Sequence, residues 1–249
     1  MSRLMLSDEL WSKLKGIMLQ HKIYDKPNLR MIVEGMLYRM RVGCPWRDLP
    51  AAFGCWNSIY QQFNRGSFKN KLMQIFKVLV HTPDLEWEFI DGSIVRAHQH
   101  STGACSTENE AIGKSRGGNT TKIHMAVDAF GLPIEFHLTG GEVHDAKAAP
   151  ELIEQLPKSD YVIADKGYDS EDIREQIREK GSIPNIPRKI NAKTGNADID
   201  WCLYKYRHLV ENVFARLKHF RAIATRYDKL KRNYASMIAM ACSCMWLPM

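Results

Sequence analysis

The spacing of apolar residues changes once along the chain, near Leu85, and this change limits what the chain can fold into. Before it, apolar residues recur at the three- and four-residue intervals of helices, as in the run from residue 29 to Gly43. After it come short apolar runs of strand length, separated by turn residues and helical segments. The sequence therefore predicts a small all-helical N-terminal domain at residues 1–82 and an α/β domain at residues 83–249.

The α/β part is expected to form a mixed sheet flanked by helices. The run WEFIDGSIV at residues 87–95 is apolar on both faces, as a central strand is. Two further runs, at residues 122–128 and 132–140, meet at the turn DAFG and predict a hairpin. Helical and strand patterns then alternate from Asp145 to Ile186, which favours a parallel edge.

The helical part contains a tight corner at residues 44–54, where prolines and a glycine interrupt the pattern. The helix expected after it fits either of two structures. It is the second helix of a helix-turn-helix, with residues 56–71 reading a DNA groove, or it belongs to a plain packing module. The sequence leaves both alternatives open.

The excess positive charge lies in one segment. The chain has a formal net charge of +7, and residues 203–232 hold nine lysines and arginines against two acids, Glu211 and Asp228. Such segregation favours a polyanionic partner over a helix whose cations merely face solvent. The longest apolar tract, residues 234–249, is too short to span a bilayer and predicts a buried terminal helix without a membrane role.

Four residues of the basic segment are spaced to share one stripe of a helix. Tyr204, Arg207, Glu211 and Lys218 lie at offsets of 0, 3, 7 and 14. At about 100° per residue these offsets fall within about 60° of arc. A carboxylate placed among two cations and a phenol can hold a metal ion beside a phosphate.

Two aspartates stand where strands seldom carry charge. Asp91 interrupts an apolar strand, where an unpaired carboxylate is costly, and Asp165 follows the strand YVIA at the sheet edge where α/β proteins place their sites. An acid at a strand end is also a common helix cap. With Glu211, the two aspartates would offer hard oxygen ligands to two Mg²⁺ ions, or to Mn²⁺ as a substitute, and such ions drive phosphodiester cleavage. Arg207 and Lys218 would then hold the phosphates.

These residues make the sequence resemble bacterial insertion-sequence transposases of the DDE type, in particular the insertion-sequence-five family. The motifs that carry the resemblance are GCPWRDLPAAFG, FIDGSIVRAHQH, SRGGNTTKIHMAVDAFGLPI, HDAKAAPEL, ADKGYDS and YRHLVENVFARLKHFRAIATRYDK. The resemblance implies an RNase H-like core and Mg²⁺-dependent cleavage of terminal inverted repeats, followed by strand transfer to target DNA. It further implies an N-terminal domain that binds the DNA ends and a homodimer or higher assembly on DNA.

The resemblance also assigns residues. Its catalytic and metal-binding triad falls on Asp91, Asp165 and Glu211. DNA contacts are expected from the signature helix, its neighbouring arginines and a polar loop: Tyr204, Arg207, Lys218, Arg216, Arg221, Arg116 and Lys122. One departure bears on the activity of this copy, because a tryptophan is expected at or near Gly66, and loss of a large core aromatic costs about 3 kcal/mol or more.

Three functions fit these features. The first is a DNA transposase, and the second is a catalytically inactive, transposase-derived regulator that only binds DNA. The third is an RNase H-type nuclease without strand transfer. The opening residues lack the apolar run of a signal peptide and the cysteines are scattered, which fits a cytoplasmic, nucleoid-associated bacterial protein.

Overall fold

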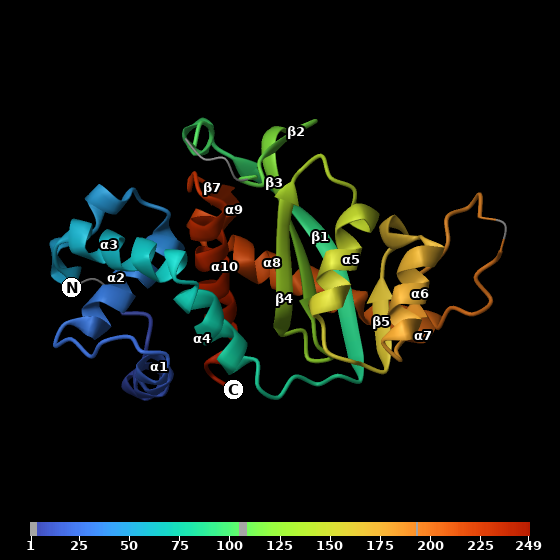
Figure 1. The fold of residues 1–249 in the computed structure, drawn as a ribbon, viewed down its shortest axis with the longest axis horizontal. Coiled ribbons are helices and arrows are strands. Elements are labelled where there is room, and N and C mark those ends of the chain that lie inside the picture. Colours follow the sequence, from blue (N-terminus) through green and yellow to red (C-terminus); the bar gives the residue numbers. More distant parts are fainter. Residues whose placement is uncertain (1–3, 105–108, 193) are drawn as a thin grey trace. The chain divides into compact units, whose positions relative to one another are not determined.

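The computed structural model describes residues 4–104, 109–192 and 194–249 and divides them between two compact units (Figure 1). The helical unit is drawn from Met1–His81, His98–Glu110 and Leu217–Met249, and the sheet unit from Thr82–Ala97 and Ala111–Arg216. The boundary near residue 82 matches the change of periodicity. The structure differs from the expected domain of residues 83–249 in assigning the last 33 residues to the helical unit.

The helical unit begins and ends its first helices where the sequence predicts. The Ser7 hydroxyl accepts a hydrogen bond from the backbone N–H of Leu10, and Gly43, at φ 73°, ends the second helix in the left-handed conformation that favours glycine. The helices are α1 (Asp8–Gln20), α2 (Leu29–Val42), α3 (Trp56–Phe68), α4 (Lys71–Leu79), α9 (Arg221–Ala224) and α10 (Lys231–Trp246). Shorter elements are the 3₁₀ turns η1 (Trp46–Asp48), η2 (Ala51–Phe53) and η3 (Gln99–Ser101) and strand β7 (Thr225–Arg226).

Helix α10 forms the centre of the helical unit. It is buried nearly all round, as the sequence predicted for its apolar tract, and it packs against α3 and α4. Those two helices bury only one face each, with Ile59 and Phe63 inward on α3 and Ile75 and Phe76 inward on α4. The short N-terminal helices therefore need α10 to complete a core.

Part of the basic segment is internal. Arg226 is fully buried, and its guanidinium donates to the backbone carbonyls of Asp228 and Lys229. The Asp228 carboxylate accepts two hydrogen bonds from the Arg39 guanidinium, at 3.1 and 3.2 Å, and both side chains are buried. Arg226 thus stabilises the loop before α10, and its charge is not available to a surface partner.

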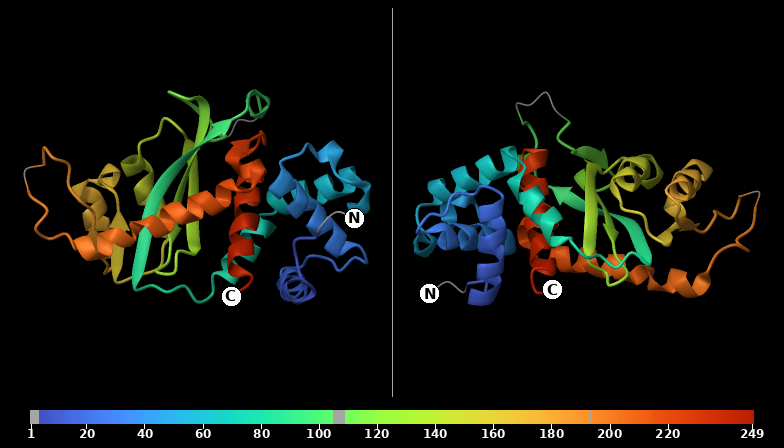
Figure 2. Two further views of the ribbon diagram at one scale, coloured as in Figure 1. Left: turned by 180° about the vertical axis from the view of Figure 1, so that it is seen from behind. Right: turned by 60° about the horizontal axis from the view of Figure 1, so that its bottom comes forward.

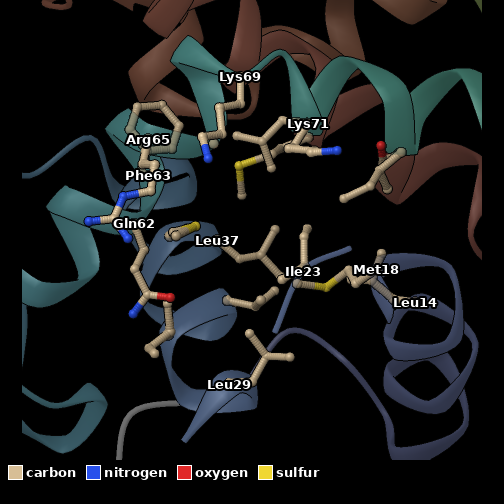
Figure 3. Close-up of a pocket in the computed structure, with 18 of the residues that line it drawn as sticks. Leu14, Met18, Ile23, Leu29, Leu37, Gln62, Phe63, Arg65, Lys69 and Lys71 are labelled. Carbon is tan, nitrogen blue, oxygen red and sulfur yellow. The ribbon is translucent and has the colours of Figure 1, made fainter. Parts of the chain in front are cut away.

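A cavity of about 780 Å³ lies inside the helical unit, surrounded by α1, α2, α3, α4 and α10. Its walls are mainly aliphatic, and Figure 3 shows Met18, Ile23 and Leu37 around it. Gly66 of α3 forms part of the wall, and a Cβ built there meets a single atom, Leu72 Cγ, at 3.9 Å. The structure thus has open space at the position where the family resemblance leads us to expect a tryptophan.

The sheet unit follows the predicted order of strands and helices. Its strands are β1 (Trp87–Ala97), β2 (Gly113–Ser115), β3 (Gly118–Val127), β4 (Pro133–Gly140), β5 (Tyr161–Ala164) and β6 (Ile183–Asn185). Its helical segments are α5 (Asp145–Gln155), η4 (Lys166–Tyr168), α6 (Glu171–Glu179), α7 (Trp201–Tyr204), η5 (Lys205–Arg207) and α8 (His208–Lys218). Residues 187–200 carry no regular structure among those described, as expected for a polar loop.

Strand β1 is central and joins two kinds of pairing. On one side β1 pairs antiparallel with β3, and β3 pairs antiparallel with both β2 and β4. On the other side β1 pairs parallel with β5, and β5 pairs parallel with β6. This order and these directions are those of an RNase H-like mixed sheet, so the predicted fold class is confirmed. No helix among the described residues is both long enough and apolar enough to cross a membrane.

Helices cover both faces of this sheet. Helices α5 and α6 lie over one face, where Leu152 and Ile177 join a buried cluster with Ile90 and Ala164 of the strands. Helix α8 lies over the opposite face, as Figure 1 and the view from behind in Figure 2 show, and buries Val210. The sheet is therefore buried on both faces, which explains the two-sided apolar character of its central strand.

Candidate active site

Asp91 and Asp165 follow a pair of residues that are matched on neighbouring strands. In the parallel register of β1 and β5, Ile90 pairs with Ala164; Asp91 is the next residue of β1, and Asp165 directly follows the end of β5. Backbone N–H groups already hold both carboxylates: Gly92 donates to Asp91 Oδ1 at 2.8 Å and Gly167 donates to Asp165 Oδ1 at 2.7 Å. Two acids that are distant in sequence thus share one edge of the sheet, as the sequence predicted.

The Asp91 carboxylate is half-buried, and the groups around it shift its pKa in opposite directions. Burial raises the pKa of Asp91 above its ordinary value, and the neighbouring Asp165 carboxylate raises it further. The Gly92 N–H and the Arg207 guanidinium act in the other direction and favour the ionised form. A cation at this place would favour that form as well.

The third acid is connected to the first through an arginine. Arg207 Nη1 donates to Asp91 Oδ2 at 2.8 Å, and Arg207 Nη2 donates to Glu211 Oε1 one helical turn further on. The guanidinium therefore lies between the two carboxylates. The structure brings together Asp91, Asp165, Arg207 and Glu211, four of the residues that the sequence singled out.

The helix that carries Glu211 differs from the expected one. The sequence predicted a single helix from Tyr204 to Lys218, but the 3₁₀ turn η5 separates α7 from α8. A 3₁₀ turn advances by about 120° per residue, and three such residues leave Tyr204 within about 40° of arc of Arg207, Glu211 and Lys218, so the four side chains still share one stripe. Tyr204 packs edge-on against the ring of Trp201, with centroids 5.7 Å apart.

A further carboxylate, Asp145, reaches this site from the first residue of α5. The position of a Cβ on Gly167 lies 2.8 Å from Asp165 Oδ1 and 3.7 Å from Asp145 Oδ2, so the two carboxylates face the same small space. The Lys122 ammonium lies 3.3 Å from Asp145 Oδ1 and donates to the Val143 carbonyl at 2.8 Å. The sequence considered Asp145 only as the start of a helix.

This placement changes the interpretation of Lys122. The sequence predicted that Lys122 contacts DNA, but the residue is buried and its ammonium is directed to Asp145 and Val143. The geometry favours a role in holding Asp145. Arg116, Arg216, Lys218 and Arg221, the other candidates outside the site, are exposed.

The site offers the ligands that Mg²⁺ prefers, although they are not arranged around a common point. Among the described residues, no three histidine, cysteine, aspartate or glutamate side chains are grouped so that they could hold an ion as they stand. Two polar atoms at the site are buried without a hydrogen-bond partner among the described residues, Asp145 Oδ1 and the Tyr168 hydroxyl. Carboxylate oxygens are the ligands that a hard cation prefers, although Asp145 Oδ1 lies 3.3 Å from the Lys122 ammonium and 3.5 Å from His124 Nδ1.

Comparison with known proteins agrees with both parts of the chain. The family described as "Transposase DDE domain" matches residues 89–246, and the family described as "Putative transposase of IS4/5 family" matches residues 6–76. The boundary between the two matches falls at the change of periodicity near Leu85.

Individual relatives share the same descriptions. The "Putative transposase for insertion sequence element IS6501" of Brucella ovis is 36% identical over 132 residues, which make up 51% of this chain and 98% of that protein. The "Putative transposase for insertion sequence element IS402" of Burkholderia cepacia is 31% identical over 133 residues, 49% of this chain and 60% of that protein. Among solved structures, the piggyBac transposase synaptic complex with hairpin DNA covers 79% of this chain and 51% of its own, with 12% identity and a TM-score of 0.38.

Proposed function

The chain belongs to the IS4/IS5 family of DDE transposases, and we propose that it cuts the terminal inverted repeats of an insertion sequence and joins them to target DNA. The DDE domain implies polynucleotidyl transferase activity. One observation carries the assignment of residues. Asp91 and Asp165 are adjacent on paired strands, and Arg207 connects Asp91 to Glu211.

In this proposal Asp91, Asp165 and Glu211 hold two Mg²⁺ ions, with Mn²⁺ as a substitute. When bound, the ions supply activation of the attacking water or 3′-hydroxyl and stabilisation of the leaving oxygen. The backbone N–H groups of Gly92 and Gly167 fix the two aspartates in advance. Glu211 is exposed and joins them once Arg207 turns its guanidinium from the carboxylates to a DNA phosphate.

DNA contacts in this proposal come from both units. In the sheet unit the candidates are Tyr204, Arg216 and the loop residue Arg116, and in the helical unit they are Lys218 and Arg221. Residues 1–82 would bind the DNA ends, and two or more copies would hold a pair of ends together. In this proposal α3, which follows the corner after α2, is the second helix of a helix-turn-helix, so residues 56–71 are the first segment to test for groove contacts.

The test uses DNA from the borders of the gene, because these borders contain the terminal repeats. Purified protein with Mg²⁺ should cut at the repeat ends, and Asp91→Asn, Asp165→Asn and Glu211→Gln should each abolish cutting while DNA binding is retained. Glu154→Gln, which removes an exposed acid of α5 away from the strand ends, is the matched control and should cut normally. Normal cutting by all three site variants would refute the assignment.

Two other functions predict different results in the same assay. A DNA-binding regulator that has lost catalysis would bind the ends and show no cutting with Mg²⁺ or Mn²⁺ in the wild-type protein. A nuclease would cut but give no product in which the cut end is joined to target DNA. The adjacent positions of Asp91 and Asp165 and the connection of Asp91 to Glu211 through Arg207 favour the transposase, since a regulator has no use for this grouping of acids.

A further inference from the structure

We propose that Asp145 is a fourth carboxylate of the metal site and contributes to the binding of the divalent ion. The inference rests on the proposed function, because it places Asp145 beside the three acids already assigned. It adds a residue that reaches the site from a different element, the first turn of α5. Its support comes from the space that Gly92 leaves for Asp145, one unpaired buried hydroxyl and one lysine.

Two glycines follow the catalytic aspartates closely, and one of them makes room for Asp145. Gly92 comes directly after Asp91, and a Cβ on Gly92 would collide with Asp145 Oδ1. Gly167 comes two residues after Asp165, and a Cβ there would lie 2.8 Å from Asp165 Oδ1 and at the ordinary contact distance of 3.7 Å from Asp145 Oδ2. Neither glycine has the positive φ that requires glycine for backbone reasons. The lack of a side chain at Gly92 therefore serves the close approach of Asp145 to the strand that carries Asp91.

One buried polar atom at this place has no hydrogen-bond partner among the described residues. It is the hydroxyl of Tyr168, a residue that is 1% exposed and ends η4, three positions after Asp165. Burial raises the pKa of Tyr168 well above its ordinary value, and the charges of Asp145, Asp91 and Asp165 raise it further, in that order. An unpaired buried hydroxyl is costly, and an ion with its hydration shell would satisfy it.

Lys122 explains how a further carboxylate is tolerated without an ion. Its ammonium lies 3.3 Å from Asp145 Oδ1 and is anchored on the Val143 carbonyl. Lys122 therefore offsets the charge of Asp145, as Arg207 offsets those of Asp91 and Glu211. Lys122 and Arg207 thus reduce the repulsion among these carboxylates, as a bound cation would.

A purely structural role for Asp145 is the alternative to exclude. An acid at the start of a helix is favoured by the helix dipole, and an ion pair with Lys122 adds stability. That role predicts a less stable Asp145→Asn protein with unchanged metal affinity. A role in metal binding predicts weaker ion binding at equal stability.

The experiment measures Mn²⁺ binding to the DNA-free full chain by calorimetry and by electron paramagnetic resonance. Asp145→Asn is expected to weaken Mn²⁺ binding by about tenfold, whereas the α5 control Glu154→Gln leaves it unchanged. Thermal melts monitor folding. If Asp145→Asn unfolds, the double variant Asp145→Asn/Lys122→Met removes both charges together and is expected to fold and to show the same tenfold loss.

The outcomes separate this inference from the proposed function. Wild-type binding that Asp91→Asn abolishes and Asp145→Asn leaves unaltered would overturn the role of Asp145 and retain the catalytic triad. Absence of Mn²⁺ binding and of DNA cutting by the wild-type protein would overturn the proposed function itself. Weakened binding in Asp145→Asn, with normal binding in Glu154→Gln, supports both.

Discussion

A larger side chain at Gly66 is expected to stabilise the helical unit, because this residue borders a cavity of about 780 Å³. A Cβ at Gly66 meets only Leu72 Cγ at 3.9 Å, which is an ordinary contact. Gly66→Ala should add about 0.5–1 kcal/mol to the free energy of unfolding through the backbone of α3. Leucine has nearly the helix propensity of alanine, so the difference between the two variants reports the filling of the cavity.

The size of that difference follows from burial. A leucine side chain moved from water into an apolar interior gains about 1.5–3 kcal/mol and loses about 0.5–1 kcal/mol of rotamer freedom. Gly66→Leu should therefore be about 1–2 kcal/mol more stable than Gly66→Ala. The side chain has aliphatic neighbours to contact, because Leu37, Ile75 and Leu72 also line the cavity.

Gly16 provides the matched control. It lies inside α1, is exposed, and has no atom within 4 Å of a Cβ built on it. Gly16→Ala and Gly16→Leu should therefore gain similar, backbone-derived stability. Urea unfolding followed by circular dichroism compares all four variants. Equal stability of Gly66→Leu and Gly66→Ala would refute the reasoning, as would an excess for leucine of the same size at Gly16.

Three further changes test other parts of the structure. Glu88 is 1% exposed and burial raises its pKa to about 7, so its contribution to stability is present below its unfolded pKa and is lost as the pH rises through about 7. In urea melts at pH 8, the Glu88→Gln protein should be up to about 3 kcal/mol more stable than the wild-type protein, because glutamine does not ionise. The two proteins should differ little at pH 5. Asp228→Asn should destabilise the protein by about 3–5 kcal/mol because it leaves the buried Arg39 guanidinium without its carboxylate, and Arg39→Met/Asp228→Leu should recover much of the loss in the same melts. Arg216→Gln should lower the dependence of DNA affinity on salt by about one unit of slope in binding titrations at increasing salt, and an unchanged slope would show that Arg216 touches no phosphate.

The sequence was sufficient for the sheet unit because periodicity and the cost of buried charge are local signals. A nine-residue run that is apolar on both faces predicted the central strand, and the acid in its middle predicted the site residue Asp91. The end of YVIA placed Asp165 at the same edge, and the structure pairs the preceding residues, Ile90 and Ala164. These inferences needed no knowledge of distant contacts.

Contacts between distant segments could not be predicted in this way. The apolar tract at the C-terminus predicted a buried helix, but nothing in its pattern says whether a sheet or other helices bury it. The structure packs α10 against α3 and α4. Arg226 was counted with the surface cations for a similar reason, because its burial depends on carbonyl groups that the loop before α10 supplies.

The stripe from Tyr204 to Lys218 shows how far helical geometry can be extrapolated. One 3₁₀ turn, η5, interrupts the α-helix, and no proline or glycine in the sequence predicts this turn. Its three residues leave Tyr204, Arg207, Glu211 and Lys218 within about 40° of arc. Arg207 and Glu211 meet because they are four residues apart across a single turn. The stripe therefore persists, although one continuous α-helix does not carry it.

The sequence contains a glycine next to a catalytic aspartate, but this feature points to Asp145 only when the structure is known. A glycine after an aspartate is common in turns, so Gly92 alone predicts nothing about a fourth carboxylate. In the structure Gly92 has no positive φ, and a Cβ on it would collide with Asp145 Oδ1. The backbone conformation therefore does not require glycine at this position, whereas the approach of the Asp145 carboxylate does. It follows that Gly92→Ala should disturb ion binding even though it alters no ligand, since the added methyl group displaces Asp145 Oδ1 from the strand that carries Asp91.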